Sequence, residues 1–173
     1  MKHFITVLCA LLLCGAHCNA QKLALSTNAA DYADKGTLNI ETSYGFARHW
    51  SVNAAARYNP FELGSKQRAF AVGARWWPWY IYSGWWISGV AQYQEYSVRD
   101  DEIAEGDRYG GGISGGFSQM LGPHLNLDVG FGFWGGYEVY STYGCAVCDR
   151  RTSAGTRYFL RPNDLILALV YVF

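Results

Sequence analysis

Four segments of the chain alternate strictly between bulky apolar residues and small or polar ones. An alternation with a period of two residues is typical of a β-strand whose two faces meet different surroundings. The pattern therefore predicts an all-β protein in which each strand separates two environments. The segments are residues 37–46 (TLNIETSYGF), 50–58 (WSVNAAARY), 68–77 (RAFAVGARWW) and 125–134 (LNLDVGFGFW).

The character of the two faces predicts what each one meets. One face carries large aliphatic and aromatic side chains, and the other carries Gly, Ala, Ser and Asn with isolated charges. Charged residues make up 16% of the chain, against about a quarter in soluble domains, whereas aromatic residues make up 17%. Because the small face is too sparsely charged to be a solvated exterior, we expect it to line a narrow barrel and the bulky face to meet lipid.

The whole chain predicts eight such strands. The connections 47–50 (ARHW), 78–84 (PWYIYSG) and 121–124 (LGPH) are short and alternate with longer polar connections, as in outer-membrane barrels. The predicted fold is all-β, an eight-stranded antiparallel up-and-down transmembrane β-barrel preceded by a cleaved signal peptide. The even strand number places both termini on the short-turn, periplasmic side. The strands are expected near residues 22–31, 37–46, 50–60, 68–79, 84–97, 108–120, 124–141 and 157–173.

The N-terminal segment predicts export. A basic residue, Lys2, precedes the apolar run FITVLCALLLCGA, and small residues follow, as in a secretory signal peptide. We interpret residues 1–20 as the signal and residues 21–173 as a barrel in the outer membrane of a Gram-negative cell. A lipoprotein signal with Cys18 as the lipidated residue is the alternative, but His17 stands where such signals have a small residue.

One stretch, residues 76–94 (WWPWYIYSGWWISGVAQYQ), also has the length of a transmembrane helix and carries no charge. Pro78 and Gly84 interrupt it, however, and five Trp residues gather around its centre. We interpret the stretch as two strands joined by a turn, with an aromatic girdle beside the turn.

The segment 165–173 (LILALVYVF) is expected to be the closing strand, with its odd-numbered residues on the lipid face. Tyr171 and Phe173 resemble the aromatic signal by which outer-membrane barrels are recognised for assembly. The predicted partners are therefore outer-membrane lipid and, through this strand, the barrel-assembly machinery. The chain has 14 basic and 14 acidic residues, a balance that gives no electrostatic reason to expect nucleic acid as a partner.

Four charged residues fall on the predicted lumen face: Glu41, Arg57, Arg75 and Asp128. Such a set can form a polar pore or relay, or it can form ion pairs that plug the lumen. An eight-stranded barrel leaves room inside for little more than side chains, and an unpaired buried charge is costly. We therefore favour ion pairs and a plugged lumen.

Cys145 and Cys148 form a C-x-x-C pair in the connection before the last strand. A redox pair would be expected at a helix N-terminus, and a zinc site would need two further ligands. Neither is apparent around the pair, so a local loop disulfide or a reduced pair is favoured. No catalytic, cofactor-binding or metal-binding residue is predicted elsewhere, since His49 and His124 fall in periplasmic turns and the acidic residues of 100–107 are interpreted as a solvated loop.

Several motifs follow one another along the chain: LALSTN (23–28), RYNPF (57–61), ARWW (74–77), YGGGISGGFSQMLGPHLNLDVGFGFW (109–134), CAVC (145–148) and RYFLRPNDLILALVYVF (157–173). In this order they resemble the domain-of-unknown-function 3575 family, a group of small predicted outer-membrane barrels of the Bacteroides type. The resemblance covers nearly the whole chain after the signal. It implies a barrel and its location but no established activity. One departure is Arg161-Pro162-Asn163, where the family tends to have Gly-Pro-Thr.

The sequence thus predicts a small integral outer-membrane barrel with a plugged polar lumen, a structural or surface-interaction protein of the cell envelope and not an enzyme. Its loops would contact an envelope or surface-appendage protein. A narrow channel or a carrier for small molecules is the alternative. An outer-membrane enzyme is less favoured, because no Ser, His and Asp residues can be placed together on one rim.

Overall fold

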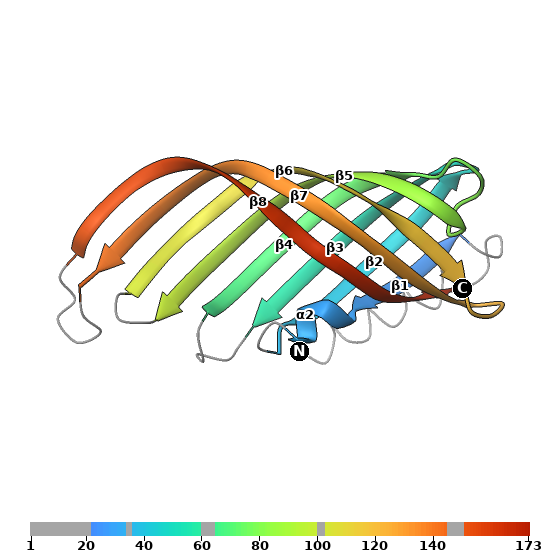
Figure 1. Cartoon of the computed structure of the whole chain (residues 1–173), viewed down its shortest axis with the longest axis horizontal. Coiled ribbons are helices and arrows are strands. Elements are labelled where there is room, and N and C mark those ends of the chain that lie inside the picture. The colour runs from blue at the N-terminus through green and yellow to red at the C-terminus, as the bar shows by residue number, and fades with distance from the viewer. Residues whose placement is uncertain (1–21, 34–35, 60–64, 100–102, 145–150) are drawn as a thin grey trace, which may run out of the picture.

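The computed structural model describes residues 22–33, 36–59, 65–99, 103–144 and 151–173, which form a closed barrel (Figure 1). Neighbouring strands pair antiparallel in sequence order, and the first strand pairs with the last. The predicted eight-stranded up-and-down β-barrel is therefore confirmed. The strands are β1 (Leu23–Asn28), β2 (Leu38–Ala47), β3 (Trp50–Asn59), β4 (Ser65–Trp76), β5 (Gly84–Arg99), β6 (Ile103–Met120), β7 (Leu125–Tyr143) and β8 (Arg151–Val172), and one short helix, α2 (Ala29–Ala33), follows β1.

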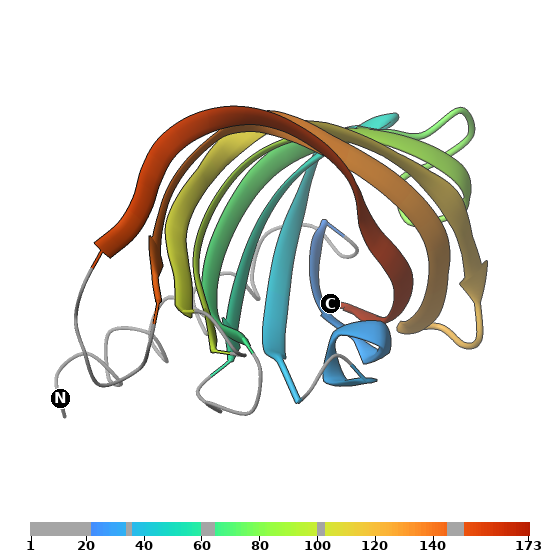
Figure 2. The same cartoon turned by 60° about the vertical axis from the view of Figure 1, so that its left-hand side comes forward.

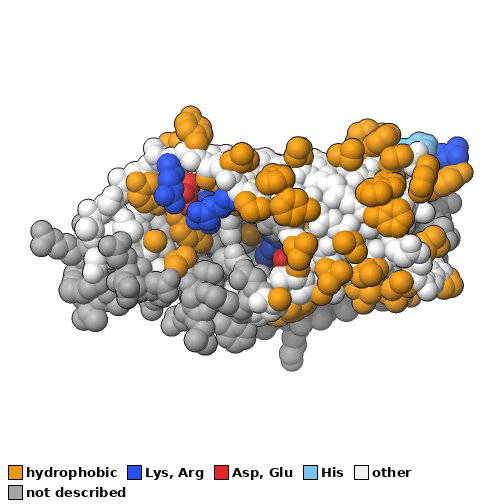
Figure 3. All heavy atoms as spheres, in the orientation of Figure 1, with side chains coloured by type: hydrophobic (Ala, Val, Ile, Leu, Met, Phe, Trp, Pro, Cys, Tyr) orange, Lys and Arg blue, Asp and Glu red, His pale blue; other side chains and the backbone are white. Residues whose placement is uncertain are grey.

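Each face of the strands carries the residues that the alternation predicts for it. In β7 the side chains of Val129, Phe131 and Phe133 are about half exposed, whereas Asn126 and Asp128 are buried. The wall is one strand thick (Figure 2), so the first set lies outside and the second lies inside. Figure 3 shows hydrophobic side chains distributed over the outer surface of the barrel. The small or charged face therefore lines the lumen.

The connections at one end of the barrel are short, as predicted, and we call this the short-turn end. They comprise residues 48–49, 77–83 and 121–124. At the opposite end β6 and β8 run further than predicted, since they begin at Ile103 and Arg151. Charged residues and Gly hide the alternation there, but they do not prevent backbone pairing, and the ladders continue to the strand ends.

β1 ends at Asn28, earlier than predicted, because the side chain of Asn39 takes the place of a backbone partner. Asn39 Oδ1 accepts a hydrogen bond from the Asn28 N–H (2.6 Å), and Asn39 Nδ2 donates to the Asn28 carbonyl oxygen (2.8 Å). The Asn28 side chain then caps α2 by accepting from the Ala30 N–H (3.2 Å). The chain leaves the wall here as a five-residue helix. No helix among the described residues is long and apolar enough to cross a membrane.

The seam between β1 and β8 is short, because β1 has 6 residues and β8 has 22. Its last pair is Asn28 with Ala168. Beyond that pair the Asn28 side chain contacts the edge of β8, since it accepts from the Leu167 N–H (2.9 Å) and donates to the Leu165 carbonyl oxygen (3.2 Å). Among the described strands, residues 151–164 of β8 pair with β7 alone. Figure 2 shows this part of β8 arching away from α2.

A β-bulge in β8 reverses which of its side chains face inward. A regular ladder continuing from the pair of Phe131 and Leu165 would place residue 163 opposite Phe133, but Pro162 lies there instead. Pro162 has no N–H for a ladder, and bulges and strand edges are where sheets tolerate proline. Even-numbered residues face inward on the short-turn side of the bulge, and odd-numbered residues face inward beyond it. Arg161 is thereby turned toward the lumen.

Candidate functional site

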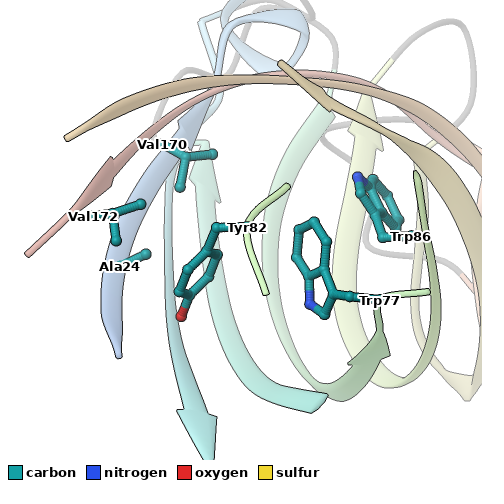
Figure 4. Packing of buried hydrophobic residues seen from close by; sticks show 6 residues of the cluster. All are labelled: Ala24, Trp77, Tyr82, Trp86, Val170 and Val172. Carbon is teal, nitrogen blue, oxygen red and sulfur yellow. The ribbon is translucent and has the colours of Figure 1, made fainter. Parts of the chain in front are cut away.

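The connection between β4 and β5 folds into the lumen and fills it at the short-turn end (Figure 4). Trp77 is completely buried, and its ring centroid lies 5.8 Å from that of Tyr82 and 6.5 Å from that of Trp86. Its Nε1 donates to Ser51 Oγ (3.0 Å). Gly130 leaves the space that Trp86 needs, because a Cβ at Gly130 would lie 3.0 Å from the indole. We call Trp77, Tyr82 and Trp86 the aromatic plug.

The aromatic girdle expected around this connection contains only three of the five Trp residues. Trp76, Trp79 and Trp85 lie outside and are exposed by 39%, 57% and 61%. The other two belong to the plug. Positive φ angles at Tyr82 (61°) and Gly84 (75°) accompany the turn of the connection back into the lumen. The sequence pattern gives no separate signal for this inward turn.

Arg75 joins two of the other predicted lumen charges beside the plug. Its Nη1 donates to Asp128 Oδ2 (3.0 Å), and its Nη2 donates to Glu41 Oε1 (3.2 Å). The guanidinium also lies 4.1 Å from the centroid of the Trp86 ring. Arg75 and Asp128 are buried, with 8% and 2% of their surfaces exposed. One cation from β4 thus holds carboxylates from β2 and β7, and we call these three residues the lower ionic cluster.

Arg57, the fourth predicted lumen charge, belongs to a separate ion pair. Its Nε lies 3.0 Å from Asp31 Oδ2. Asp31 was expected in the first strand but lies in α2. The pair therefore ties the helix to β3 and holds it against the lumen.

A second group of charges, which the sequence analysis did not identify, lies toward the other end of the strands. Glu138 is fully buried and accepts hydrogen bonds from Arg108 Nε (2.6 Å) and from Arg157 Nε. The Arg108 guanidinium lies 3.7 Å from the centroid of the Tyr96 ring. We call Arg108, Glu138 and Arg157 the upper ionic cluster. A signal for it was present, because Glu138 follows Asp128 by an even number of residues in one strand and so shares its inward face.

Between the two clusters the lumen is open. A cavity of about 630 Å³ is lined by inward side chains of β3 to β7 together with residues of α2 and β8. A narrower space of about 70 Å³ extends from it toward Arg75 and Asp128. The larger cavity contains three guanidinium groups, those of Arg57, Arg108 and Arg161. The lumen is therefore filled near the short-turn end and hollow and basic above the lower ionic cluster.

The residues of the predicted assembly signal lie on the outside of the barrel at the short-turn end. Tyr171 and Phe173 are exposed by 46% and 49%, and their ring centroids are 5.0 Å apart. His124 stacks on Tyr171 (5.9 Å between centroids), and its Nδ1 lies 2.9 Å from the Val172 carbonyl oxygen. The imidazole of His124 therefore contacts the backbone and an aromatic ring of the closing strand, β8.

Two further predictions concern the opposite end. Cys145 and Cys148 lie outside the described residues, so the loop disulfide stays a prediction. Glu105 and Asp107 were expected in a solvated loop but lie in β6, where Asp107 Oδ1 accepts a hydrogen bond from the Tyr93 hydroxyl (3.1 Å). In the part of the chain that the structure describes, no three His, Cys, Asp or Glu side chains group as metal ligands.

These features define a class of protein, an eight-stranded β-barrel with an aromatic plug, two interior ionic clusters and a basic cavity between them. The family model described as "Protein of unknown function (DUF3575)" matches residues 5–173. The chain belongs to this family, which confirms the resemblance noted from its motifs. No curated protein matches the sequence.

Proposed function

We propose that the chain is an integral outer-membrane β-barrel that does not conduct solutes and acts as a structural or surface-interaction protein of the cell envelope. The distribution of side chains across the wall carries this proposal. Large hydrophobic side chains are exposed on the outside, whereas the charged side chains of the lower ionic cluster lie inside. A soluble barrel has the opposite arrangement. A bilayer would cover the outer apolar surface.

The height of the apolar surface supports a membrane location. On β3, Trp50 and Tyr58 lie eight residues apart and are exposed by 44% and 42%; on β5, Trp85 and Tyr93 have the same separation. Eight residues of strand extend about 27 Å, or about 19 Å along the barrel axis at a tilt near 45°. This distance fits within the apolar band of outer-membrane barrels, which is about 25 Å tall and has aromatic residues at both edges.

A row of tyrosines marks the edge of this band away from the short-turn end. Tyr93, Tyr109, Tyr137 and Tyr158 lie opposite one another on four consecutive strands. The ring centroids of Tyr109 and Tyr137 are 5.8 Å apart, and those of Tyr137 and Tyr158 are 5.6 Å apart. Tyrosine is enriched at membrane interfaces, where the ring meets the acyl chains and the hydroxyl meets water.

The membrane location predicts how the protein behaves in detergent. Because every described strand pairs with a neighbour on both sides over at least part of its length, the folded barrel should resist SDS at room temperature and migrate differently after boiling. The native protein should also require detergent for extraction from the envelope fraction. A soluble periplasmic protein of similar mass, treated in parallel, is the control. Recovery of native protein in the periplasmic fraction without detergent would contradict the proposal.

The plugged lumen predicts the absence of conductance. Trp77 and Trp86 fill the barrel near the short-turn end, and Arg75 bridges the walls beside them. Liposomes that contain the refolded protein should therefore swell in small sugars no faster than empty liposomes, while liposomes that contain a general porin swell rapidly. Swelling at the porin rate would favour the channel alternative.

We propose the same partners that the sequence indicates. β8 would present Tyr171 and Phe173 to the barrel-assembly machinery, and both side chains are accessible on the outer surface. The ends of the strands opposite the short-turn end would contact an envelope or surface-appendage protein. No role with nucleic acid is proposed, since basic and acidic residues balance.

A carrier for small molecules is the second candidate function, and the cavity of about 630 Å³ favours it. We propose no enzymatic activity. The two histidines among the described residues, His49 and His124, each lie 2.9 Å from a backbone carbonyl oxygen through Nδ1, at the short-turn end and away from the cavity.

A further inference from the structure

The basic cavity reaches the outside of the barrel through the wall, at the place where β1 has ended. Its lining includes inward residues such as Gln92 of β5 and also Leu165 and Leu167, whose side chains lie on the outer face of β8. A cavity that touches both faces of one strand must pass beside the edge of that strand. The β1–β8 ladder stops at Asn28, whose side chain bonds to the backbone of Leu165 and Leu167, and beyond these bonds no described strand pairs with this edge of β8. Figure 3, which shows this side of the molecule, has a hollow with charged side chains in its depth.

The opening lies at the depth of the acyl chains if the barrel sits in the membrane as proposed. Leu165 precedes Tyr171, at the short-turn interface, by six residues. Six residues of strand correspond to about 14 Å along the axis at a tilt near 45°. The band is about 25 Å tall, so the opening begins near the middle of the band at Leu165 and continues past Pro162 into the outer leaflet. The residues around it are apolar or small, including Leu165, Leu167, Pro162 and Ala33.

The interior of the cavity has an excess of positive charge. Among the described residues of the lining, Arg57, Arg108 and Arg161 are basic and Asp31 is acidic, which gives these four residues a net charge of +2. Arg57 is paired with Asp31, and Arg108 is paired with Glu138 behind the lining. The bulge in β8 turns Arg161 toward the cavity, and none of the side chains that the structure describes forms an ion pair with it. Three glutamine side chains, at positions 67, 92 and 94, add further hydrogen-bonding groups.

We propose that this lateral cavity binds an amphiphile with an anionic phosphate or carboxylate headgroup and an acyl chain, which enters from the outer leaflet. The headgroup lies inside against Arg161 and Arg108, and the chain leaves between α2 and β8 over Leu165 and Leu167. Guanidinium groups bind such oxyanions through charge-assisted hydrogen bonds. The cavity volume lies within the usual range for ligand sites, about 300–1,000 Å³. The inference rests on the proposed membrane location and specifies what a carrier of this shape would take.

Native mass spectrometry of the refolded protein in a nonionic detergent tests the headgroup. Oleoyl lysophosphatidic acid should bind as a single copy and more tightly than oleoyl lysophosphatidylcholine of the same chain length or inorganic phosphate. Arg161→Gln should weaken this binding about tenfold, the effect of one charge-assisted hydrogen bond. Arg48→Gln is the matched control, since Arg48 lies in the short connection between β2 and β3, and it should bind as the parent does.

A second pair of variants tests the opening without changing charge. Ala33→Trp places a large side chain at the mouth of the cavity and should reduce binding, whereas Ala47→Trp at the exposed end of β2 should not. Equal binding of both lysolipids, with no effect of Arg161→Gln or Ala33→Trp, would overturn the proposal. Inorganic phosphate that binds as tightly as the lysolipid would overturn the acyl-chain part. A heat-modifiable barrel without selective binding would refute this inference alone, whereas selective binding by a protein that needs no detergent would refute the membrane location.

Discussion

Replacing Arg75 with alanine should lower the free energy of unfolding of the barrel by about 3–5 kcal/mol, because it leaves the buried carboxylate of Asp128 and the partly exposed carboxylate of Glu41 without their cation. Asp128 is 2% exposed, and its Oδ2 accepts from Arg75 at 3.0 Å. Glu41 loses the same partner. Urea unfolding in lipid vesicles, followed by tryptophan fluorescence, measures the change.

Two variants separate this effect from the general loss of an arginine. Arg48→Ala at the short-turn end, where Arg48 donates to the Tyr80 hydroxyl on the exposed surface (2.6 Å), should change stability by about 1 kcal/mol or less. A triple variant with Arg75→Met, Glu41→Gln and Asp128→Asn should recover much of the lost stability, since no buried charge is then unpaired. If Arg75→Ala unfolds at the urea concentration of the parent, the lower ionic cluster does not stabilise the barrel.

Phe131→Arg should destabilise the barrel by about 2–4 kcal/mol, the cost of an arginine that faces lipid at the middle of the bilayer. Phe131 is 46% exposed on the outer face and lies six residues after the start of β7, about 14 Å along the axis at a tilt near 45°. The variant also loses the contact between the rings of Phe131 and Phe133, whose centroids are 4.8 Å apart. Urea unfolding in lipid vesicles, followed by tryptophan fluorescence, measures this change in the free energy of unfolding as well.

Two control variants place an arginine at a different depth on the outer face and on the inner face of the wall. Gln119→Arg, at an exposed position on the outer face near the short-turn end of β6, should cost about 0–1 kcal/mol. Gly130→Arg points inward and should prevent folding, because even a Cβ there would lie 2.8 Å from the Gly115 carbonyl oxygen and 3.0 Å from Trp86. A Phe131→Arg variant as stable as the parent in lipid would mean that this face does not meet acyl chains.

The faces of the strands could be predicted because a period of two residues is a local property. The face on which a residue of β7 lies can be recognised from its sequence neighbours alone. This is why the alternation predicts that Asp128 lies inside. The same reasoning extended by ten residues would have placed Glu138 inside as well. The upper ionic cluster was therefore within reach of the sequence, and only the pairing of Glu138 with Arg108 and Arg157 needed the barrel register.

Other features depend on contacts between distant residues and could not be predicted in this way. β1 stops at Asn28 because Asn39 occupies its edge, although a capping residue followed by Ala-Ala-Asp was a local hint of a helix. The bulge at Pro162 changes the inward set of β8 by one residue, so the alternation of residues 165–173 cannot be extended to Arg161. Trp77 and Trp86 share a composition with the outer girdle, and only the path of the connection places them inside.

The short seam also has a consequence for the order in which the molecule is built. β1 and β8 are far apart along the chain, so bringing them together costs more chain entropy than forming any hairpin in the wall. In return the seam provides only five ladder pairs, from Ala24 with Val172 to Asn28 with Ala168, and among the described ladders only the one between β1 and β2, with four, is shorter. The remaining strands can zip sequentially as hairpins, and the cylinder is sealed last. Because opening the β1–β8 ladder releases much chain entropy and breaks few pairs, we expect this seam to open first on unfolding. The cylinder then becomes a curved sheet.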